Sequence, residues 1–399
     1  MQFVHISDNH LGYRQYNLDE REKDMYNAFN MCIDEIINIK PDFVVHSGDL
    51  FEQSTPPINA LYTAIKAFEK LKECNIPVYI IHGNHDVPSR ITKGSPYLIL
   101  KNMLKDKLRT FTGKKYHIFK KNNKEIFIGG SDYASIGKTT ELFDDYKLIE
   151  QESKNYKNKI LIFHQSIYSY SDIPSYELQV NNLPRGFNYY AGGHIHKRIL
   201  KTVDLQHKDN NTNNSNINNS NNNSNNTDGS QVLGWSGSTE ITDYDEYRDY
   251  KKEGKGFYLV DISKNDFDIS CVDKINIKCR DFIIDKEIKN ENDFENLVNE
   301  LNNYNDTTKP IVICGVAREL LGSLRELMNK KALYSRLSII EEDIDTTSMF
   351  LDINNKTDEM FREFLRNKKY DVEFVQGLYY EALKGDNELY DYINNYYIK

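Results

Sequence analysis

The 399-residue chain has few of the features that mark a secreted, disulfide-stabilised or membrane protein. It holds five cysteines and no Cys-x-x-Cys pair, which argues against a disulfide framework and favours a reducing compartment. No apolar run approaches the roughly 20 residues of a membrane span, and the first apolar run reaches Asp8 too soon for a signal peptide. We therefore expect a soluble cytoplasmic protein without a membrane partner.

An excess of basic residues is also missing. The chain carries 51 Lys and Arg against 60 Asp and Glu, a formal net charge of −9. This balance excludes a uniformly basic nucleic-acid-binding surface, although a local basic strip is compatible with it. At about 150 residues per domain, the length predicts two or three domains.

Short apolar runs alternate with amphipathic helical stretches through the first half of the chain. This alternation is typical of layered α/β folds. The hydrophobic spacing predicts helices over 19–39 and after Pro56-Pro57. Strands are expected at 3–7, 43–47, 78–81, 125–129, 160–164, 189–192 and 256–262.

Changes in composition divide the chain into four parts, with a first domain over 1–270. Within it, twelve of the seventeen residues at 210–226 are Asn, which predicts a disordered loop over 206–230, either a partner-binding loop or a tolerated insertion. A small α+β domain is expected over 271–341 and a linker over 342–357. The helical pattern of 358–399, with Phe361, Phe364, Phe374 and Leu378, predicts a helix pair that either docks back or binds a partner.

Five polar motifs follow apolar runs in the first domain. Carboxyl ends of strands in open α/β sheets gather ligands at one edge, and carboxylate, amide and imidazole groups form a donor set for Mn²⁺, Fe²⁺ or Zn²⁺. Each motif alone is common, but coincidence explains poorly why five of them occur in this order. They are Asp8-Asn9-His10, Gly48-Asp49, Gly83-Asn84-His85-Asp86, His164 and Gly193-His194-Ile195-His196. Of the other histidines, we expect His5, His46 and His82 in the core and His117 and His207 on the surface.

These motifs carry a specific resemblance. The segments 5–13, 46–51 and 193–198 resemble the Mre11 family of DNA double-strand-break repair nucleases within the calcineurin-like metallophosphoesterases, with bacterial SbcD proteins as more distant relatives. The segments 237–240 (Gly-Ser-Thr-Glu) and 254–257 (Gly-Lys-Gly-Phe) match the archaeal form of that family. The resemblance implies an α/β fold: a calcineurin-like β-sandwich flanked by helices, with a small α+β DNA-capping domain and C-terminal helices.

The resemblance also implies a two-metal phosphodiesterase with two Mn²⁺ ions per subunit, for which Mg²⁺, Fe²⁺ or Zn²⁺ are alternatives. Asp8, His10 and His196 are expected to bind the first ion. Asn84, His164 and His194 are expected to bind the second ion, with Asp49 bridging the two. His85 is expected to face the phosphate and to protonate the departing 3′ oxygen.

The implied function is DNA-end repair in the nucleoid, by 3′–5′ exonuclease action on duplex DNA and endonuclease action on single strands. The implied partners are DNA ends, a Rad50-type ABC ATPase gripped by the C-terminal helices, and a second copy of the chain. The helix containing Leu61, Ile65 and Phe68 and the stretch 98–104 either form that homodimer or belong to the core. The alternatives are a small-molecule or protein phosphoesterase on the same fold and a non-catalytic scaffold.

One position departs from the family pattern. Many members carry His directly after the Gly-Asp-Leu-Phe segment, where this chain has Glu52. We expect either that the Glu52 side chain hydrogen-bonds His85 and favours its protonated form, or that it is a solvated loop residue. The candidates for DNA contact are Arg14, Arg90, Lys197 and Arg198, each of which is alternatively part of a solvated charged face.

Overall fold

The computed structural model describes residues 1–87, 94–168, 170, 177–205, 231–264 and 267–340. The predicted disordered loop over 206–230, the linker over 342–357 and the C-terminal helices over 358–399 lie outside the described residues, as do Arg90 and His207.

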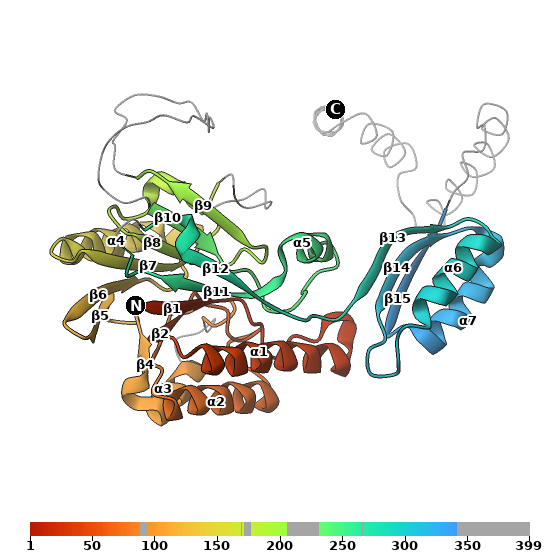
Figure 1. Cartoon of the computed structure of the whole chain (residues 1–399), viewed down its shortest axis with the longest axis horizontal. Coiled ribbons are helices and arrows are strands. Elements are labelled where there is room, and N and C mark those ends of the chain that lie inside the picture. Colours follow the sequence, from red (N-terminus) through yellow and green to blue (C-terminus); the bar gives the residue numbers. More distant parts are fainter. Residues whose placement is uncertain (88–93, 169, 171–176, 206–230, 265–266, 341–399) are drawn as a thin grey trace, which may run out of the picture.

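Two six-stranded sheets form the centre of the main body (Figure 1). The first sheet has the order β12 (Val272–Ile277), β11 (Lys255–Asp261), β1 (Gln2–Ile6), β2 (Phe43–His46), β3 (Val78–Ile80) and β4 (Leu108–Thr110). The second has the order β5 (Tyr116–Lys121), β6 (Lys124–Gly130), β7 (Asn158–His164), β8 (Tyr189–Gly193), β10 (Gln231–Trp235) and β9 (Ile199–Val203). The strands β1 to β4 are mutually parallel, as are β6, β7, β8 and β10.

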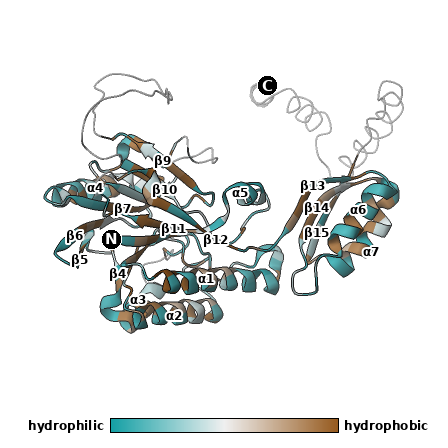
Figure 2. Cartoon of the chain, viewed as in Figure 1, coloured by the Kyte–Doolittle hydropathy of each residue, from teal (hydrophilic) through white to brown (hydrophobic). Residues whose placement is uncertain are grey.

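Alternation along the strands explains the layers. On β1, Phe3 packs between the two sheets, whereas Val4 and Ile6 face the opposite way and pack beneath helices. Helices α1 (Asp19–Ile39), α2 (Ile58–Glu73) and α3 (Pro96–Leu104) cover that outer face, and α4 (Thr139–Ser153) covers the outer face of the second sheet. The strands at the centre are predominantly hydrophobic, whereas α5 (Glu246–Glu253) is hydrophilic (Figure 2). The arrangement confirms the expected α/β sandwich flanked by helices.

A smaller unit lies beside the sandwich, near one end of α1 (Figure 1). Its three parallel strands are β13 (Phe282–Ile288), β14 (Ile311–Val316) and β15 (Tyr334–Ile339), and its helices are α6 (Glu291–Leu301) and α7 (Leu321–Lys331). Asn290 starts α6 with a capping box, because its side chain accepts from the Asp293 backbone N–H while the Asp293 carboxylate accepts from the Asn290 N–H.

The boundary between the two units differs from the expected one at 270/271. Strand β12 pairs antiparallel with β11 and therefore belongs to the sandwich, so the second unit begins after Ile277. The polar composition of 272–277 has another cause: β12 is an edge strand, and residues such as Lys274 and Asn276 face solvent. Among the described residues no helix is long and apolar enough to span a membrane.

Candidate metal centre

The five motifs converge where strands of both sheets end. Asp8 and His10 follow β1, Asp49 follows β2, and Asn84 and His85 follow β3. From the second sheet, His164 ends β7, and His194 and His196 follow β8. The structure therefore brings together all eight residues that the sequence singled out as metal ligands or catalytic acid.

The backbone of these loops is held in an unusual conformation. Asp8, His10, Asp49 and His194 all have positive φ, between 47° and 78°, which non-glycine residues seldom adopt. Such strain persists only where the surroundings enforce it, and it is frequent at functional sites. Close packing adds to the constraint, because a Cβ on Gly83 would overlap Asp49 Oδ1.

One group of ligand atoms comes from Asp8, His10 and His196, which lie within 4.8 Å of one another. The Nε2 atoms of His10 and His196 face each other at 3.1 Å. Two neutral imidazoles at this distance either share one proton or direct both lone pairs at a common cation. The Asp8 carboxylate is fixed from both sides, by the His194 backbone N–H at 2.9 Å and by the Ser7 hydroxyl at 2.5 Å.

A second group comprises Asp49, His164 and His194, with Asn84 beside them. Asn84 Oδ1 lies 2.9 Å from His194 Nδ1 and 3.0 Å from His164 Nε2. Asp49 Oδ2 lies 3.1 Å from His164 Nε2 and 3.9 Å from His10 Nε2. The Asp49 carboxylate thus stands between the two groups.

Burial and mutual attraction set the charges in this cluster. Burial alone would raise the pKa of Asp49, but His164 and His10 outweigh it and hold that pKa well below its usual range. Burial opposes protonation of His164, yet the Asp49 carboxylate raises its pKa to about 9. Burial, aided by the charge on His164, lowers the pKa of His194 to about 3. At neutral pH Asp49 is therefore ionised and His194 neutral, the forms that bind a cation, whereas His164 has to release its proton to bind one.

The Glu52 contact differs from the expected one. The Glu52 carboxylate hydrogen-bonds His10 Nδ1 at 2.8 Å and stands 3.8 Å from His85 Nδ1, beyond hydrogen-bond range. His85 Nδ1 instead donates to the Glu52 backbone carbonyl at 2.7 Å. The Glu52 side chain therefore hydrogen-bonds His10 and reaches His85 only at ion-pair distance, so it is not a solvated loop residue.

The candidates for DNA contact are not equivalent. Arg198 is buried, and its guanidinium donates inward to the carbonyls of Phe257, Ile275 and Glu253, so it stabilises the fold and is not available to DNA. Arg14 lies on the surface and pairs with Asp19 at 2.6 Å. Lys197 is partly exposed next to His196.

Two carboxylates that the sequence did not single out support the site. Asp86 is fully buried and accepts from the backbone N–H groups of Phe51 and Gly83 and from the Tyr97 hydroxyl, so it ties the loops after β2 and β3 together. Its place directly after Asn84-His85 was the available signal. Glu246, on α5, accepts from His196 Nδ1 at 2.9 Å, and nothing in its surrounding sequence indicates that role.

The donor set fits divalent cations. The first group offers one carboxylate and two imidazoles, and the second offers an amide oxygen and two imidazoles around a shared carboxylate. Mixed oxygen and nitrogen ligands of this kind suit Mn²⁺, Fe²⁺ or Zn²⁺. The rigid, strained loops preorganise the ligands, as a built metal site requires.

Comparison with known proteins agrees with this geometry. Residues 1–198 match the family described as Calcineurin-like phosphoesterase, which defines the class of the sandwich and its site. Three curated relatives are each named DNA double-strand break repair protein Mre11. The protein from Methanococcus maripaludis is 47% identical, with 100% of this chain and 99% of that protein covered. Those from Methanocaldococcus jannaschii and Thermoplasma acidophilum are 42% and 30% identical, with 97% and 90% of this chain and 96% and 81% of those proteins covered. The chain belongs to the Mre11 family.

A solved dimetal phosphatase from Danio rerio is also similar, at 11% identity and a TM-score of 0.38, over 65% of this chain and 91% of that chain. No conclusion about this chain is based on that similarity.

Proposed function

We propose that the protein is a two-metal DNA nuclease of double-strand-break repair. It hydrolyses phosphodiesters of duplex DNA from 3′ to 5′ and cuts single strands internally. The observation that supports this most directly is the position of Asp49, whose Oδ2 lies 3.1 Å from His164 and 3.9 Å from His10, between two groups of ligand atoms. Family membership directs this chemistry to DNA.

In this proposal Asp8, His10 and His196 hold one ion, and Asn84, His164 and His194 hold the other, with Asp49 shared. Mn²⁺ is the proposed metal, and Mg²⁺, Fe²⁺ and Zn²⁺ are the alternatives. When bound, a pair of divalent ions supplies an activated water and neutralises charge on the phosphate oxygens. The complete set of ligand positions argues against a non-catalytic scaffold.

His85 is the proposed catalytic acid. Its side chain is 36% exposed and packs edge-to-face on His10, with ring centroids 4.9 Å apart, so it lies at the open side of the site. The His85 backbone N–H donates to Asp49 Oδ1 at 2.9 Å, and its Nδ1–H donates to the Glu52 carbonyl. These two bonds fix the ring with Nε2 free to face the substrate, where the protonated form can give a proton to the leaving 3′ oxygen.

The second unit, which begins after Ile277 and is described as far as Ile340, is the proposed DNA-capping domain, and Arg14 and Lys197 are proposed DNA contacts beside the site. The segment 358–399, for which the sequence predicts helices, is proposed to bind a Rad50-type ABC ATPase. Such a partnership would place the protein at DNA ends in the nucleoid.

The proposed homodimer keeps the stretch 98–104 that the sequence suggested but uses a different face of α2. Phe68 is buried, and Leu61 and Ile65 pack against the core, so that stripe belongs to the fold. The exposed apolar side chains on α2 and α3 are Ile58, Tyr62, Leu98, Ile99 and Met103. These residues are the proposed contact with the second copy.

The test is cleavage of an end-labelled duplex and of a circular single strand, with Mn²⁺, Mg²⁺ or EDTA. We expect the wild type to cut both DNAs only with metal, and His85→Ala to lose activity by at least 100-fold. His117→Ala is the matched control, because His117 hydrogen-bonds the Thr110 carbonyl away from the site. If the wild type hydrolyses only a generic phosphodiester and neither DNA, the nuclease proposal is wrong.

A further inference from the structure

Two of the segments that resemble the Mre11 family, 237–240 and 254–257, contain no metal ligand. Both lie against His196. The loop 236–242 follows β10, and Lys255 begins β11. The Ser238 backbone N–H donates to the His196 carbonyl at 3.0 Å, and Lys255 Nζ donates to the same carbonyl at 2.9 Å. The backbone of His196 is therefore clamped from two sides.

The His196 side chain is held by Glu246, in the first turn of α5. Glu246 Oε1 accepts from His196 Nδ1 at 2.9 Å and from the Thr242 hydroxyl at 2.5 Å, and Thr242 Oγ1 itself lies 2.7 Å from His196 Nδ1. Glu246 Oε2 accepts from the buried Lys255 ammonium and from the Thr242 backbone N–H at 3.3 Å. The two oxygens of this carboxylate thus accept from different donors, Oε1 from side chains at the metal centre and Oε2 from Lys255 and the Thr242 backbone.

The bond from His196 Nδ1 determines what its other nitrogen can do. A neutral imidazole that donates through Nδ1–H presents an unprotonated Nε2, which is the form that binds a metal. His196 Nε2 points at His10 Nε2, 3.1 Å away, within the group that includes Asp8.

Among the described residues no carboxylate outside the ligand set hydrogen-bonds a histidine of the other group; the nearest, Glu177, stands 3.9 Å from His194 Nε2. His164 Nδ1 lies 2.6 Å from the Ser47 backbone carbonyl, and His194 Nδ1 lies 2.9 Å from Oδ1 of Asn84, which is a ligand of the same group. A change at Glu246 therefore acts on one group and leaves the other in place.

We propose that Glu246, held by Lys255, is a positioning residue that fixes His196 with Nε2 toward Asp8 and His10 and so sets the cation affinity of that group alone. The inference rests on the proposed two-metal function. It extends the site to α5 and to the two flanking segments, which carry no proposed ligand of their own.

We expect Glu246→Gln to weaken cation binding at this group through the hydrogen bonds of the new side chain. A glutamine offers one oxygen and one NH₂ group, and the buried Lys255, which can only donate, takes the oxygen. The NH₂ group then faces both His196 Nδ1 and Thr242 Oγ1, so the Thr242 hydroxyl loses its acceptor on residue 246 and turns its proton to His196 Nδ1, which has to accept. The proton moves to Nε2, where it blocks the cation.

The experiment is calorimetric titration of Mn²⁺ into the chelator-treated full chain, with histidine tautomers read by ¹⁵N NMR of the metal-free protein. The wild type should bind two ions and show His196 as the Nδ1–H tautomer. Glu246→Gln should weaken one binding step about 10- to 100-fold, leave the other unchanged and convert His196 to the Nε2–H tautomer. Asp245→Asn, which removes an exposed carboxylate next to Glu246, is the control and should match the wild type.

The double variant Glu246→Gln/Lys255→Met removes both buried charges together and lets the amide oxygen turn toward His196. It should recover part of the lost affinity. Unchanged binding in Glu246→Gln, equal weakening of both steps, or an Nε2–H tautomer of His196 in the wild type would each overturn the inference. Fewer than two ions bound by a wild type with the Nδ1–H tautomer would instead overturn the two-metal function and leave the positioning role of Glu246 standing.

Discussion

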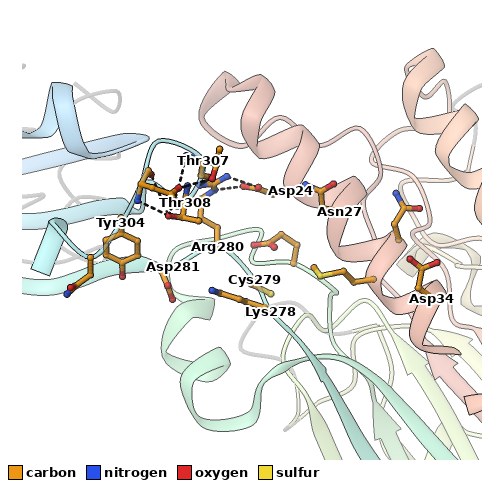
Figure 3. A pocket seen from close by; sticks show the side chains of 15 residues that line it. Asp24, Asn27, Asp34, Lys278, Cys279, Arg280, Asp281, Tyr304, Thr307 and Thr308 are labelled. Carbon is orange, nitrogen blue, oxygen red and sulfur yellow. Dashed lines mark hydrogen bonds and ion pairs between the residues drawn. The ribbon is translucent and has the colours of Figure 1, made fainter. Parts of the chain in front are cut away.

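Asp24, on α1, connects the sandwich to the second unit, and its removal gives a prediction whose size follows from the contacts. Both Asp24 oxygens accept from the Arg280 guanidinium, one of them at 2.8 Å, and Oδ2 also accepts from Arg21 at 2.6 Å. Arg280 in turn donates to the Lys309 carbonyl at 2.7 Å. These groups lie at a crevice of about 870 Å³ between α1 and the second unit (Figure 3).

Asp24→Asn removes the charge that two mostly buried guanidinium groups share. Breaking a buried ion pair costs about 3–5 kcal/mol. Here Arg21 keeps Glu240 at 3.2 Å, Arg280 keeps the Lys309 carbonyl, and asparagine keeps one acceptor oxygen. We therefore expect a smaller loss of about 2–3 kcal/mol in the free energy that holds the second unit against the sandwich.

Hydrogen exchange with mass spectrometry measures this loss locally. A loss of that size accelerates exchange roughly 30- to 150-fold in peptides covering 278–288. Asp34→Asn is the matched control, because Asp34 lines the same crevice on the same helix but forms an exposed pair with Lys70. Exchange in Asp24→Asn within about threefold of the control would show that the Asp24 ion pairs do not hold the second unit against the sandwich.

Three further predictions concern stability and the metal centre. Burial lowers the pKa of His5 and of His46 to about 3, so the unfolded chain takes up these protons near pH 6.5 and the folded protein does not. Each should therefore reduce the free energy of unfolding by about 1.4 kcal/mol per pH unit below 6.5, and a urea midpoint that stays flat from pH 7 to 4.5 would contradict this. Gly83→Ala should displace Asp49 and abolish two-ion Mn²⁺ binding, which calorimetry would measure; retention of both sites would show that the loop can yield. Glu52→Gln should lower Mn²⁺ affinity about tenfold through His10 and leave the pH–rate profile in place, whereas a shifted profile with unchanged affinity would restore a link to His85.

The sandwich could be predicted from the sequence because its strands are short apolar runs separated by amphipathic helices. The expected helix over 19–39 coincides with α1, and the expected strands at 43–47 and 160–164 agree with β2 and β7 to within two residues. The convergence of the motifs followed from the same pattern, because parallel strands deliver their carboxyl ends to one edge. Helix α4 was not predicted, because its buried residues, Leu142, Tyr146 and Ile149, are interspersed with charged ones.

What could not be predicted depends on side chains that meet across distant loops. Arg198 looked like a basic surface residue after His-x-His, but its acceptors lie on or next to strands 38 to 78 residues further along the chain. Glu52 and His85 were expected to interact, and they do so through the Glu52 carbonyl, because the orientation of a loop backbone is not encoded in residue type. Edge strand β12 was assigned to the wrong unit because composition reflects exposure as well as domain membership.

The proposed function needs two cations at the edge where strands of both sheets end. Crystals of the protein grown with MnCl₂ and measured at the manganese absorption edge would locate them. We expect two anomalous peaks, one among Asp8, His10 and His196 and one among Asn84, His164 and His194, with the Asp49 carboxylate between them. A single peak, or peaks away from Asp49, would contradict the proposed function.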